Sequence, residues 1–464
     1  MRKFIHSCLL MFIGMVIFSS PADAQANETT ILFKSEVTLE QKHEFLKQYQ
    51  LEPLYEISEV NLVSVNMDET QRIALVEHPL VEAINQATSI DKPEITQVES
   101  IPFQPKFRPQ ARMSALPLLW EYQWDMRQVT SDGDSYALHT PTTNTVIAII
   151  DSGIDSSHPD LQHSLVAGSK NLVPAGGHNG TEPDELGAPD DIADKLGHGT
   201  EVAGQIAADG LIKGAAPGIG IKAYRVFGTK SAKTSWVIKA IVEAANDDAD
   251  VINLSLGEYM LVSGKYSNNT NDSAEYHAYK RAVDYAYNKG SVIVAAVGND
   301  GVDISDKQQM INILNSKLKD VTVIKGKVLD MPGHLKNVIA VGSTGPEKGL
   351  STFSNYDKGF LNILAPGGDL KYFNEYGQER WTEEGWFEKE FILTTSLEGG
   401  YNYAVGTSYA APKVAAAAGL VIDKYGWRDN PKQVMKHLKK SSTTEPTLTD
   451  KYRHLNLVTL LSEN

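Results

Sequence analysis

The fold is decided by residues 146–153, which read Val-Ile-Ala-Ile-Ile-Asp-Ser-Gly. Five apolar residues in a row suit a strand that is buried on both faces of a parallel sheet. Asp151 follows this strand directly, at the edge of the sheet where open α/β folds bind their ligands. We therefore expect a central strand with an acidic group at its carboxyl end.

Similar apolar runs recur along the chain, with helical segments between several of them. Further strands are expected at 223–227, 251–256, 292–297, 338–341 and 361–364. Helices are expected near 200–208, 234–246, 274–288, 408–424 and 431–439. This alternation predicts an α/β fold, a doubly wound parallel sheet with flanking helices on both faces.

A smaller unit precedes this domain, at residues 25 to about 95. Strands are expected at 31–33, 54–57, 62–65 and 81–84, and helices at 38–49 and 68–77, capped by Thr38 and Asp68. The order β-α-β-β-α-β predicts a small α+β unit of the split βαβ, ferredoxin-like type. Five prolines between positions 93 and 117 then predict an extended linker.

The first 24 residues have the features of a secretory signal peptide. Arg2 and Lys3 precede an apolar run at about 9–18, and residues 22–24 (Ala-Asp-Ala) fit a cleavage site. The only cysteine, Cys8, lies in this segment, so the mature chain would use neither disulfides nor thiol chemistry. We expect a secreted, extracellular protein with no membrane anchor in its mature form.

Composition restricts the classes of partner. The 464 residues are 42% hydrophobic and 22% charged, as in ordinary globular proteins, and the formal net charge is -15. Binding to nucleic acid needs a basic face, so this charge argues against a nucleic-acid partner. An acidic surface instead favours solubility and basic partners.

Three polar residues stand in glycine-containing contexts next to predicted strands or helices. Asp151 precedes Ser-Gly, His198 lies in Gly-His-Gly-Thr (197–200), and Ser408 lies in Gly-Thr-Ser-Tyr-Ala-Ala-Pro (406–412). Each residue alone has an ordinary explanation as a turn residue, a structural histidine or a helix cap. Together they indicate nucleophilic catalysis by a serine.

The segment 145–440 resembles the subtilisin-like serine proteases, in which these three motifs occur in the same order. The resemblance extends to residues 216–218, 255–257 and 296–299. Residues 25–95 resemble the inhibitory propeptide of that family, and residues 120–127 resemble the start of lantibiotic leader peptidases. The implied division is a signal peptide at 1–24, a propeptide with linker at 25–112 and a catalytic domain at 113–464.

The resemblance implies a role for each residue. Ser408 would be the nucleophile, His198 its general base and Asp151 the group that orients the imidazole. Asn299 would stabilise the oxyanion with its side-chain amide. The backbone of Ser255, Leu256 and Gly257 would pair with an extended peptide substrate.

One further acidic residue, Asp330, suggests which residue the enzyme prefers before the scissile bond. By the resemblance, Asp330 would lie at the base of the pocket for the residue before the scissile bond, and a buried carboxylate there would pair best with arginine. We therefore expect cleavage after Arg. Alternatively, Asp330 only caps the turn at residues 332–333, and Asp300 and Asp303 are rival acids.

The sequence also departs from the family pattern. Tyr409 replaces the methionine that usually follows the nucleophile, which leaves the local packing in question. The loop at 209–213 looks shorter than the family's calcium loop, and only Asp160 matches a calcium-ligand position. The chemistry needs no cofactor, and a structural Ca²⁺ is compatible with the resemblance without an assigned ligand set.

The predicted function is the removal of a leader peptide from a lantibiotic precursor by a serine endopeptidase. Its partners would be a precursor peptide and its own propeptide, and a monomer is expected. The alternatives are a secreted protease of broad specificity and a catalytically silent, exported peptide-binding protein. The order Asp, His, Ser disfavours an α/β-hydrolase, and no His-Glu-x-x-His motif supports a zinc protease.

Two inserted segments have no assigned role. The acidic segment 181–194 is interpreted as a solvated loop, with an acidic rim for a basic substrate or a cation as the alternative. The aromatic segment 370–391 is interpreted as the packing of a long loop, with an aromatic wall for substrate as the alternative.

Overall fold

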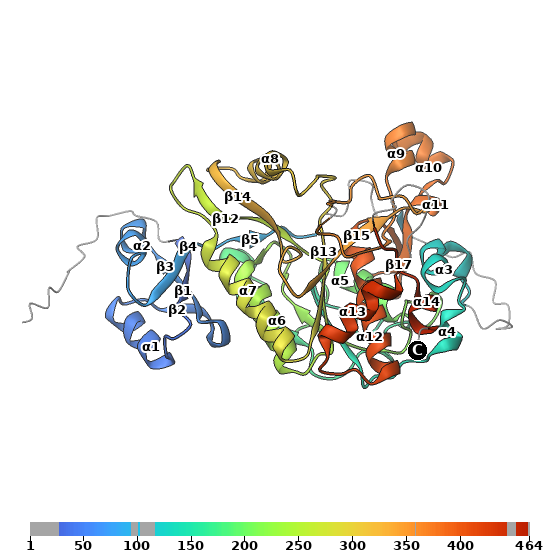
Figure 1. The fold of residues 1–464 in the computed structure, drawn as a ribbon, viewed down its shortest axis with the longest axis horizontal. Helices are drawn as coiled ribbons and strands as arrows, with labels where there is room; N and C mark the ends of the chain where they lie inside the picture. Colours follow the sequence, from blue (N-terminus) through green and yellow to red (C-terminus); the bar gives the residue numbers. More distant parts are fainter. Residues whose placement is uncertain (1–26, 94–100, 103–116, 358, 443–451, 463–464) are drawn as a thin grey trace, which may run out of the picture.

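The computed structural model describes residues 27–93, 101–102, 117–357, 359–442 and 452–462. The expected signal peptide, most of the expected linker and the expected boundary at 112–113 lie outside the described residues. The described chain forms a small N-terminal unit beside a large α/β domain (Figure 1). Among the helices of the described ranges, none has both the length and the apolar character required to cross a membrane.

The N-terminal unit is a four-stranded antiparallel sheet with two α-helices. Its elements are β1 (Asn27–Phe33), α1 (Leu39–Gln48), β2 (Pro53–Ile57), η1 (Ser58–Val60), β3 (Leu62–Met67), α2 (Glu69–Leu75) and β4 (Val81–Gln86). The strand order β2-β3-β1-β4 is the split βαβ arrangement that the sequence predicts. Thr38 and Asp68 cap α1 and α2 through reciprocal hydrogen bonds with Gln41 and Gln71.

Parallel strands form the central sheet of the large domain, in the order β16-β15-β13-β11-β7-β9-β8. They are β7 (Val146–Asp151), β8 (Lys170–Asn171), β9 (Gly220–Arg225), β11 (Val251–Leu254), β13 (Val292–Ala296), β15 (Val338–Thr344) and β16 (Ile363–Pro366). All six predicted strands are present, and the predicted doubly wound parallel sheet is confirmed.

Helices cover both faces of this sheet, which explains the uninterrupted apolar runs. In β7, Ile147 and Ile149 belong to the core on one face, whereas Ala148 and Ile150 belong to the core on the other. The first core includes α5 (His198–Ala207) and α12 (Thr407–Tyr425), and the second includes α6 (Thr234–Asn246) and α7 (Ser273–Asn288). Full burial of each isoleucine contributes roughly 1.5–3 kcal/mol.

Several smaller elements were not predicted. The antiparallel strands are β5 (Ser89–Ile90) with β10 (Ala232–Lys233), β12 (Glu258–Tyr266) with β14 (Val323–Met331), and β17 (Ile392–Thr395) with β18 (Tyr401–Ala404) and β6 (Ile101–Pro102). The unpredicted helices are η2 (Trp120–Tyr122), α3 (Trp124–Thr130), α4 (Ser135–Leu138), η3 (His178–Gly180), α8 (Lys307–Lys317), α9 (Lys371–Tyr376), α10 (Gln378–Glu383), α11 (Phe387–Glu390), η4 (Leu397–Gly399) and α14 (Leu457–Ser462). The helix predicted near 431–439 is present as α13 (Pro431–Ser441).

The N-terminal unit packs against α7 through β1 and β4 (Figure 1). Glu275 of α7 accepts hydrogen bonds from Thr30 Oγ1 at 2.6 Å and from the Thr88 N–H at 3.2 Å. It also accepts one from Asn85 Nδ2. Arg281, on the same helix, donates to two backbone carbonyls of the unit at 2.9 and 2.8 Å. Buried polar contacts therefore fix how the two parts of the chain dock.

Candidate active site

Asp151 and His198 meet at the carboxyl end of the central sheet. Asp151 ends β7 and His198 begins α5. The His198 Nδ1 lies 2.8 Å from Asp151 Oδ1, and both side chains are buried. A methyl group on Gly199 would lie 2.1 Å from the carbonyl oxygen of Gly153, so only glycine permits this approach of α5 to the loop after β7.

Carboxylates around His198 control its charge. Burial disfavours the imidazolium and is the largest single effect, but Asp151, Glu201 and Asp194 together outweigh it, so the pKa of His198 is raised above its ordinary 6.5. Asp194 also accepts hydrogen bonds from the Gly197 N–H at 2.8 Å and the Thr200 N–H at 2.9 Å, which fixes the start of α5. A histidine whose charged form is stabilised in this way is suited to accept a proton.

Ser408 lies in the first turn of α12, near the positive end of the helix dipole. Gly406, just before it, has a φ of 150°, which favours glycine. The Ser408 hydroxyl donates to the carbonyl oxygen of Ser255 at 3.0 Å, and the Ser255 hydroxyl donates to the Ser408 carbonyl at 2.7 Å. The structure thus brings the predicted nucleophile and the predicted substrate-binding segment together.

Asn299 follows β13 and lies beside the start of α12. Its Oδ1 accepts hydrogen bonds from the Thr407 N–H at 2.9 Å and the Thr407 hydroxyl at 2.8 Å. Its Nδ2 lies near Gly406, where an added methyl group would be 3.3 Å away. Because Oδ1 accepts both Thr407 donors, the orientation of the amide is fixed and its NH₂ group is left for other partners.

Asp330 lies near the end of β14, beside the segment 255–257. Its side chain is only 2% exposed, and a methyl group on Gly257 would lie 3.6 Å from Asp330 Oδ1. The turn at 332–333 is closed by the backbone, since the His334 N–H donates to the Asp330 carbonyl at 2.9 Å. Burial raises the pKa of the Asp330 carboxyl well above its ordinary range. The Leu256 side chain, by contrast, packs into the core, so only its backbone is available to a substrate.

Two residues that the sequence analysis missed surround Asp330. Asn355 Nδ2 lies 3.4 Å from Asp330 Oδ2 and 2.6 Å from the Tyr259 hydroxyl. The same amide donates to the Val297 carbonyl at 2.7 Å, and the Tyr259 hydroxyl donates to Asp300 at 2.5 Å. No local pattern marks Asn355 or Tyr259, because their positions depend on strands that are distant in the sequence.

The rival acids are engaged by other groups. Lys317 Nζ lies 3.3 Å from Asp300 Oδ1, which gives that carboxylate a cation. Asp303 accepts hydrogen bonds from the Ser305 N–H at 2.9 Å and hydroxyl at 2.6 Å within its own turn. Within the described ranges, the ion pairs closer than 4.0 Å include Asp300 and not Asp330. Of these three acids, Asp330 is thus the one that is buried and has no ion pair among the described residues.

Asp160, which matches a calcium-ligand position, instead holds a loop. Its Oδ2 accepts a hydrogen bond from the Ile212 N–H at 3.1 Å, and its carbonyl accepts one from the Asp209 N–H at 2.9 Å. The described residues contain no group of three or more His, Cys, Asp or Glu side chains placed to hold a metal.

The acidic segment 181–194 is partly a buried anchor, so its interpretation as a solvated loop is wrong for Glu182 and Glu185. Glu185 lies 2.8 Å from Arg225 Nη1 and 3.0 Å from Arg225 Nη2. Burial opposes its ionisation, but the hydrogen bonds from Arg225 and Lys195 lower the pKa of Glu185 to about 2. Glu182 accepts a hydrogen bond from the Thr229 hydroxyl at 2.8 Å. These contacts attach the segment to β9 and to the loop that follows it.

The aromatic segment 370–391 folds into α9, α10 and α11, which project from the domain (Figure 1). Trp381 is fully buried, and its indole N–H donates to Glu390 Oε2 at 2.7 Å. Tyr376 and Trp386 pack together with ring centroids 4.5 Å apart on the outer side. The aromatic side chains of this segment thus pack against one another, as the sequence analysis interpreted them.

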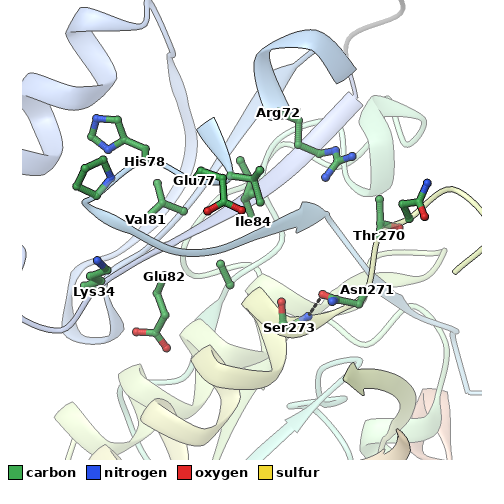
Figure 2. A pocket seen from close by; sticks show the side chains of 14 residues that line it. Lys34, Arg72, Glu77, His78, Val81, Glu82, Ile84, Thr270, Asn271 and Ser273 are labelled. Atoms are coloured by element: carbon green, nitrogen blue, oxygen red, sulfur yellow. Dashed lines mark hydrogen bonds between the residues drawn. The ribbon is translucent and has the colours of Figure 1, made fainter. Parts of the chain in front are cut away.

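An open hollow of about 430 Å³ lies between the N-terminal unit and the large domain. Figure 2 shows Arg72 and His78 from the unit, and Asn271 and Ser273 from the large domain, along its walls. None of the residues predicted to act in catalysis lines it. The hollow is therefore a feature of the docking interface, separate from the candidate active site.

Comparison with known proteins identifies relatives of this chain. A sequence profile of the subtilase family matches residues 142–455. The nisin leader peptide-processing serine protease of Lactococcus lactis subsp. lactis is 48% identical over 343 residues, which cover 74% of this chain and 49% of that protein. The chain thus aligns with about half the length of that relative.

Two further relatives are matched over more of their length. The epidermin leader peptide-processing serine protease of Staphylococcus epidermidis is 41% identical over 342 residues, 73% of this chain and 72% of that protein. The crystal structure of an epidermin leader peptide-processing serine protease from Staphylococcus aureus superposes with a TM-score of 0.83 at 35% identity, covering 94% of this chain and 98% of that chain.

Proposed function

Because the chain belongs to the subtilase family of serine proteases, we propose that it is an exported endopeptidase that removes the leader peptide from a lantibiotic precursor by cutting after arginine. The likeness to the nisin and epidermin leader peptidases supports the class of substrate. The buried carboxylate of Asp330 beside Gly257 is the observation that carries the specificity.

In the proposed mechanism, the Ser408 hydroxyl leaves its hydrogen bond to Ser255 and turns toward His198. As the Ser408 oxygen bonds to the scissile carbonyl carbon, its proton passes to the imidazole, whose charged form Asp151 stabilises. The Asn299 amide and the Ser408 N–H receive the oxyanion. The imidazolium then protonates the leaving amine, and water hydrolyses the acyl-enzyme by the same proton transfers in reverse.

The specificity follows from the cost of burying a charge. A buried carboxylate without a cation is unfavourable, and the raised pKa of Asp330 expresses that cost. An arginine guanidinium offers two parallel N–H groups to a carboxylate, with a geometry that lysine does not provide. The residue before the scissile bond would therefore bind best as arginine and would restore the charge on Asp330.

The test uses peptides that are matched except for Arg, Lys or Leu before the scissile bond. In wild type, Arg should be preferred, and in Asp330→Gly its advantage over Leu in kcat/KM should fall by about 2–5 kcal/mol, the scale of truncating a buried charge pair. Asp300→Asn is the matched control and should keep the preference for Arg. A preference for Leu in wild type would overturn the proposed pocket. If only Asp300→Asn lost the preference for Arg, Asp300 rather than Asp330 would be the acid that binds the arginine.

Substrate choice separates leader processing from broad proteolysis. The enzyme should cut a lantibiotic precursor once, at the junction of leader and core, and should leave casein largely intact. Extensive digestion of casein at comparable rates would favour a protease of broad specificity. A serine-directed phosphonate should label Ser408, whereas a silent peptide-binding protein would not react.

A further inference from the structure

Tyr409, the residue after the nucleophile, forms a hydrogen bond with an acid on the helix of the histidine. Its side chain is 7% exposed, and its hydroxyl donates to Glu201 Oε2 at 2.5 Å. Glu201 lies on α5, three residues after His198, and is 8% exposed. This hydrogen bond therefore links the helix that begins beside the nucleophile to the helix that begins at the base.

A second hydrogen bond to the Glu201 carboxylate also comes from a neutral group. Asn402 Nδ2 donates to Glu201 Oε1 at 3.3 Å. Burial raises the pKa of Glu201, while the hydrogen bond from Tyr409 acts in the opposite direction and favours the carboxylate. Among the effects that oppose burial and favour the Glu201 carboxylate, the hydrogen bond from Tyr409 is thus the largest, followed by the charge of His198, whereas Asp194 acts with burial.

The pair lies against His198. The rings of His198 and Tyr409 have centroids 5.7 Å apart, with 56° between their planes. Three carboxylates from different parts of the chain act electrostatically on the imidazole: Asp151 at the end of β7, Asp194 in the loop before α5, and Glu201 on α5. All three favour its charged form, and Asp151 has the largest effect.

Packing alone does not explain two polar groups at this point. A phenylalanine and an aliphatic residue would fill the same volume without the cost of burying a hydroxyl and a carboxylate. We propose that Tyr409 and Glu201 are a positioning pair, in which the Tyr409 hydroxyl keeps Glu201 ionised so that a second carboxylate supports the imidazolium of His198. The proposal rests on His198 being the general base of the proposed function.

The consequence is a change in the pH at which His198 titrates. Without the Tyr409 hydroxyl, Glu201 takes up a proton at higher pH and its negative charge is lost near the imidazole. The imidazolium is then less stable, and His198 loses its proton at lower pH. Because the reaction needs neutral His198 in the free enzyme, the acid limb of kcat/KM should move to lower pH.

The experiment compares Tyr409→Phe, which keeps the ring, with Glu201→Gln, which removes the charge. Each should shift the acid limb of kcat/KM downward by roughly 0.5–2 pH units, the scale of losing one neighbouring charge in an intermediate dielectric. The double variant should shift it no further than the larger single shift, because both changes remove the same charge. Tyr266→Phe is the matched control, since the Tyr266 hydroxyl donates to buried Asp272 at 2.5 Å in a separate hydrophobic cluster. It should leave the acid limb in place.

A second readout does not depend on the substrate. NMR titration of His198 in the full-length Ser408→Ala protein, with and without Tyr409→Phe, should show a lower imidazole pKa in the double variant. A uniform loss of kcat/KM at every pH, with an unchanged His198 titration, would show that the pair is only structural and would overturn the proposal. If the pKa of His198 falls as expected but the enzyme does not cleave leader peptides, the role of Tyr409 and Glu201 is upheld and the proposed substrate is rejected.

Discussion

The candidate catalytic side chains differ in which of their atoms are already engaged. Asn299 uses its Oδ1 for Thr407 and so keeps its amide in one orientation. The Ser408 hydroxyl donates to the Ser255 carbonyl, and in the proposed mechanism it leaves this hydrogen bond to reach His198. Single substitutions should therefore have graded effects, large for the nucleophile and smaller for an oxyanion donor.

We expect Ser408→Ala to lower turnover by on the order of a millionfold, as in a related subtilisin. Asn299→Ala should cost roughly a hundredfold to a thousandfold in kcat, because one oxyanion donor is lost while the nucleophile and base remain. Single-turnover cleavage of an Arg peptide by the purified variants measures both. Near-normal turnover by Ser408→Ala would contradict the assignment of the nucleophile.

Among the secondary-structure elements, α3 is fastened to α12 by a buried ion pair. Lys413 Nζ lies 2.8 Å from Asp125 Oδ2, and both side chains are fully buried. The same ammonium also donates to Gln205 of α5 at 2.5 Å. Burial lowers the pKa of Lys413, and Asp125 limits that fall. The pair thus joins the segment that begins the large domain to the two helices of the candidate site.

Lys413→Met should destabilise the protein strongly, because it leaves Asp125 buried without a partner. The expected loss is about 3–5 kcal/mol of unfolding free energy, whereas Asp125→Leu with Lys413→Met should recover most of it. Denaturant unfolding in the Ser408→Ala background, which prevents self-digestion, measures the difference. A loss of less than about 1 kcal/mol in the single variant would mean that the pair is not isolated from water.

At the scale of the whole molecule, the N-terminal unit covers two acids of the large domain. Burial raises the pKa of Glu275 to about 7. Burial, together with Glu275 and Asp272, raises the pKa of Glu258 to about 8. When the unit leaves and water reaches these groups, their pKa values should return toward 4.5. Docking therefore takes up protons.

Proton uptake on docking predicts that the unit binds most tightly at low pH. Its affinity should be greatest near pH 4.5 and should fall as the pH rises through about 7 and 8, by up to roughly tenfold per pH unit for each acid. The inhibition constant of the separated unit against the mature enzyme, measured from pH 5 to 8, tests this. Glu275→Gln should flatten the dependence, while Glu59→Gln, at an exposed contact with Asn246, is the control. An affinity independent of pH would contradict the prediction.

We also expect the chain to process itself between about Gln97 and Met113, a region of which the structure describes only residues 101–102. Arg112-Met113 is the preferred bond, in keeping with cleavage after arginine, whereas Arg108 precedes a proline. The Ser408→Ala protein should stay full length after signal removal, and a trace of active enzyme should then cut it. N-terminal sequencing identifies the bond. Normal maturation of Ser408→Ala without another protease would show that processing is not autocatalytic.

Local sequence patterns determined most of the fold. The run 146–150 marks β7 because a strand buried on both faces must be apolar on both. Thr38 with Gln41, and Asp68 with Gln71, mark helix starts because their hydrogen bonds span only three residues. The glycines around His198 and Ser408 mark close approaches of the backbone. Such signals can be recognised from the sequence alone because the interactions that cause them span only a few residues.

Tertiary structure alone decided which distant groups meet. Tyr409 reaches Glu201 across 208 residues, and Asn355 reaches Tyr259 across 96. The ribbon of β12 and β14, which carries Asp330, was not predicted because its strands lie far apart and mix polar with apolar residues. Hydrogen bonds and charge effects act over a few ångströms of space. The strand order of the sheet, which no local pattern encodes, therefore determines how these groups pair and which charges His198 and Asp330 experience.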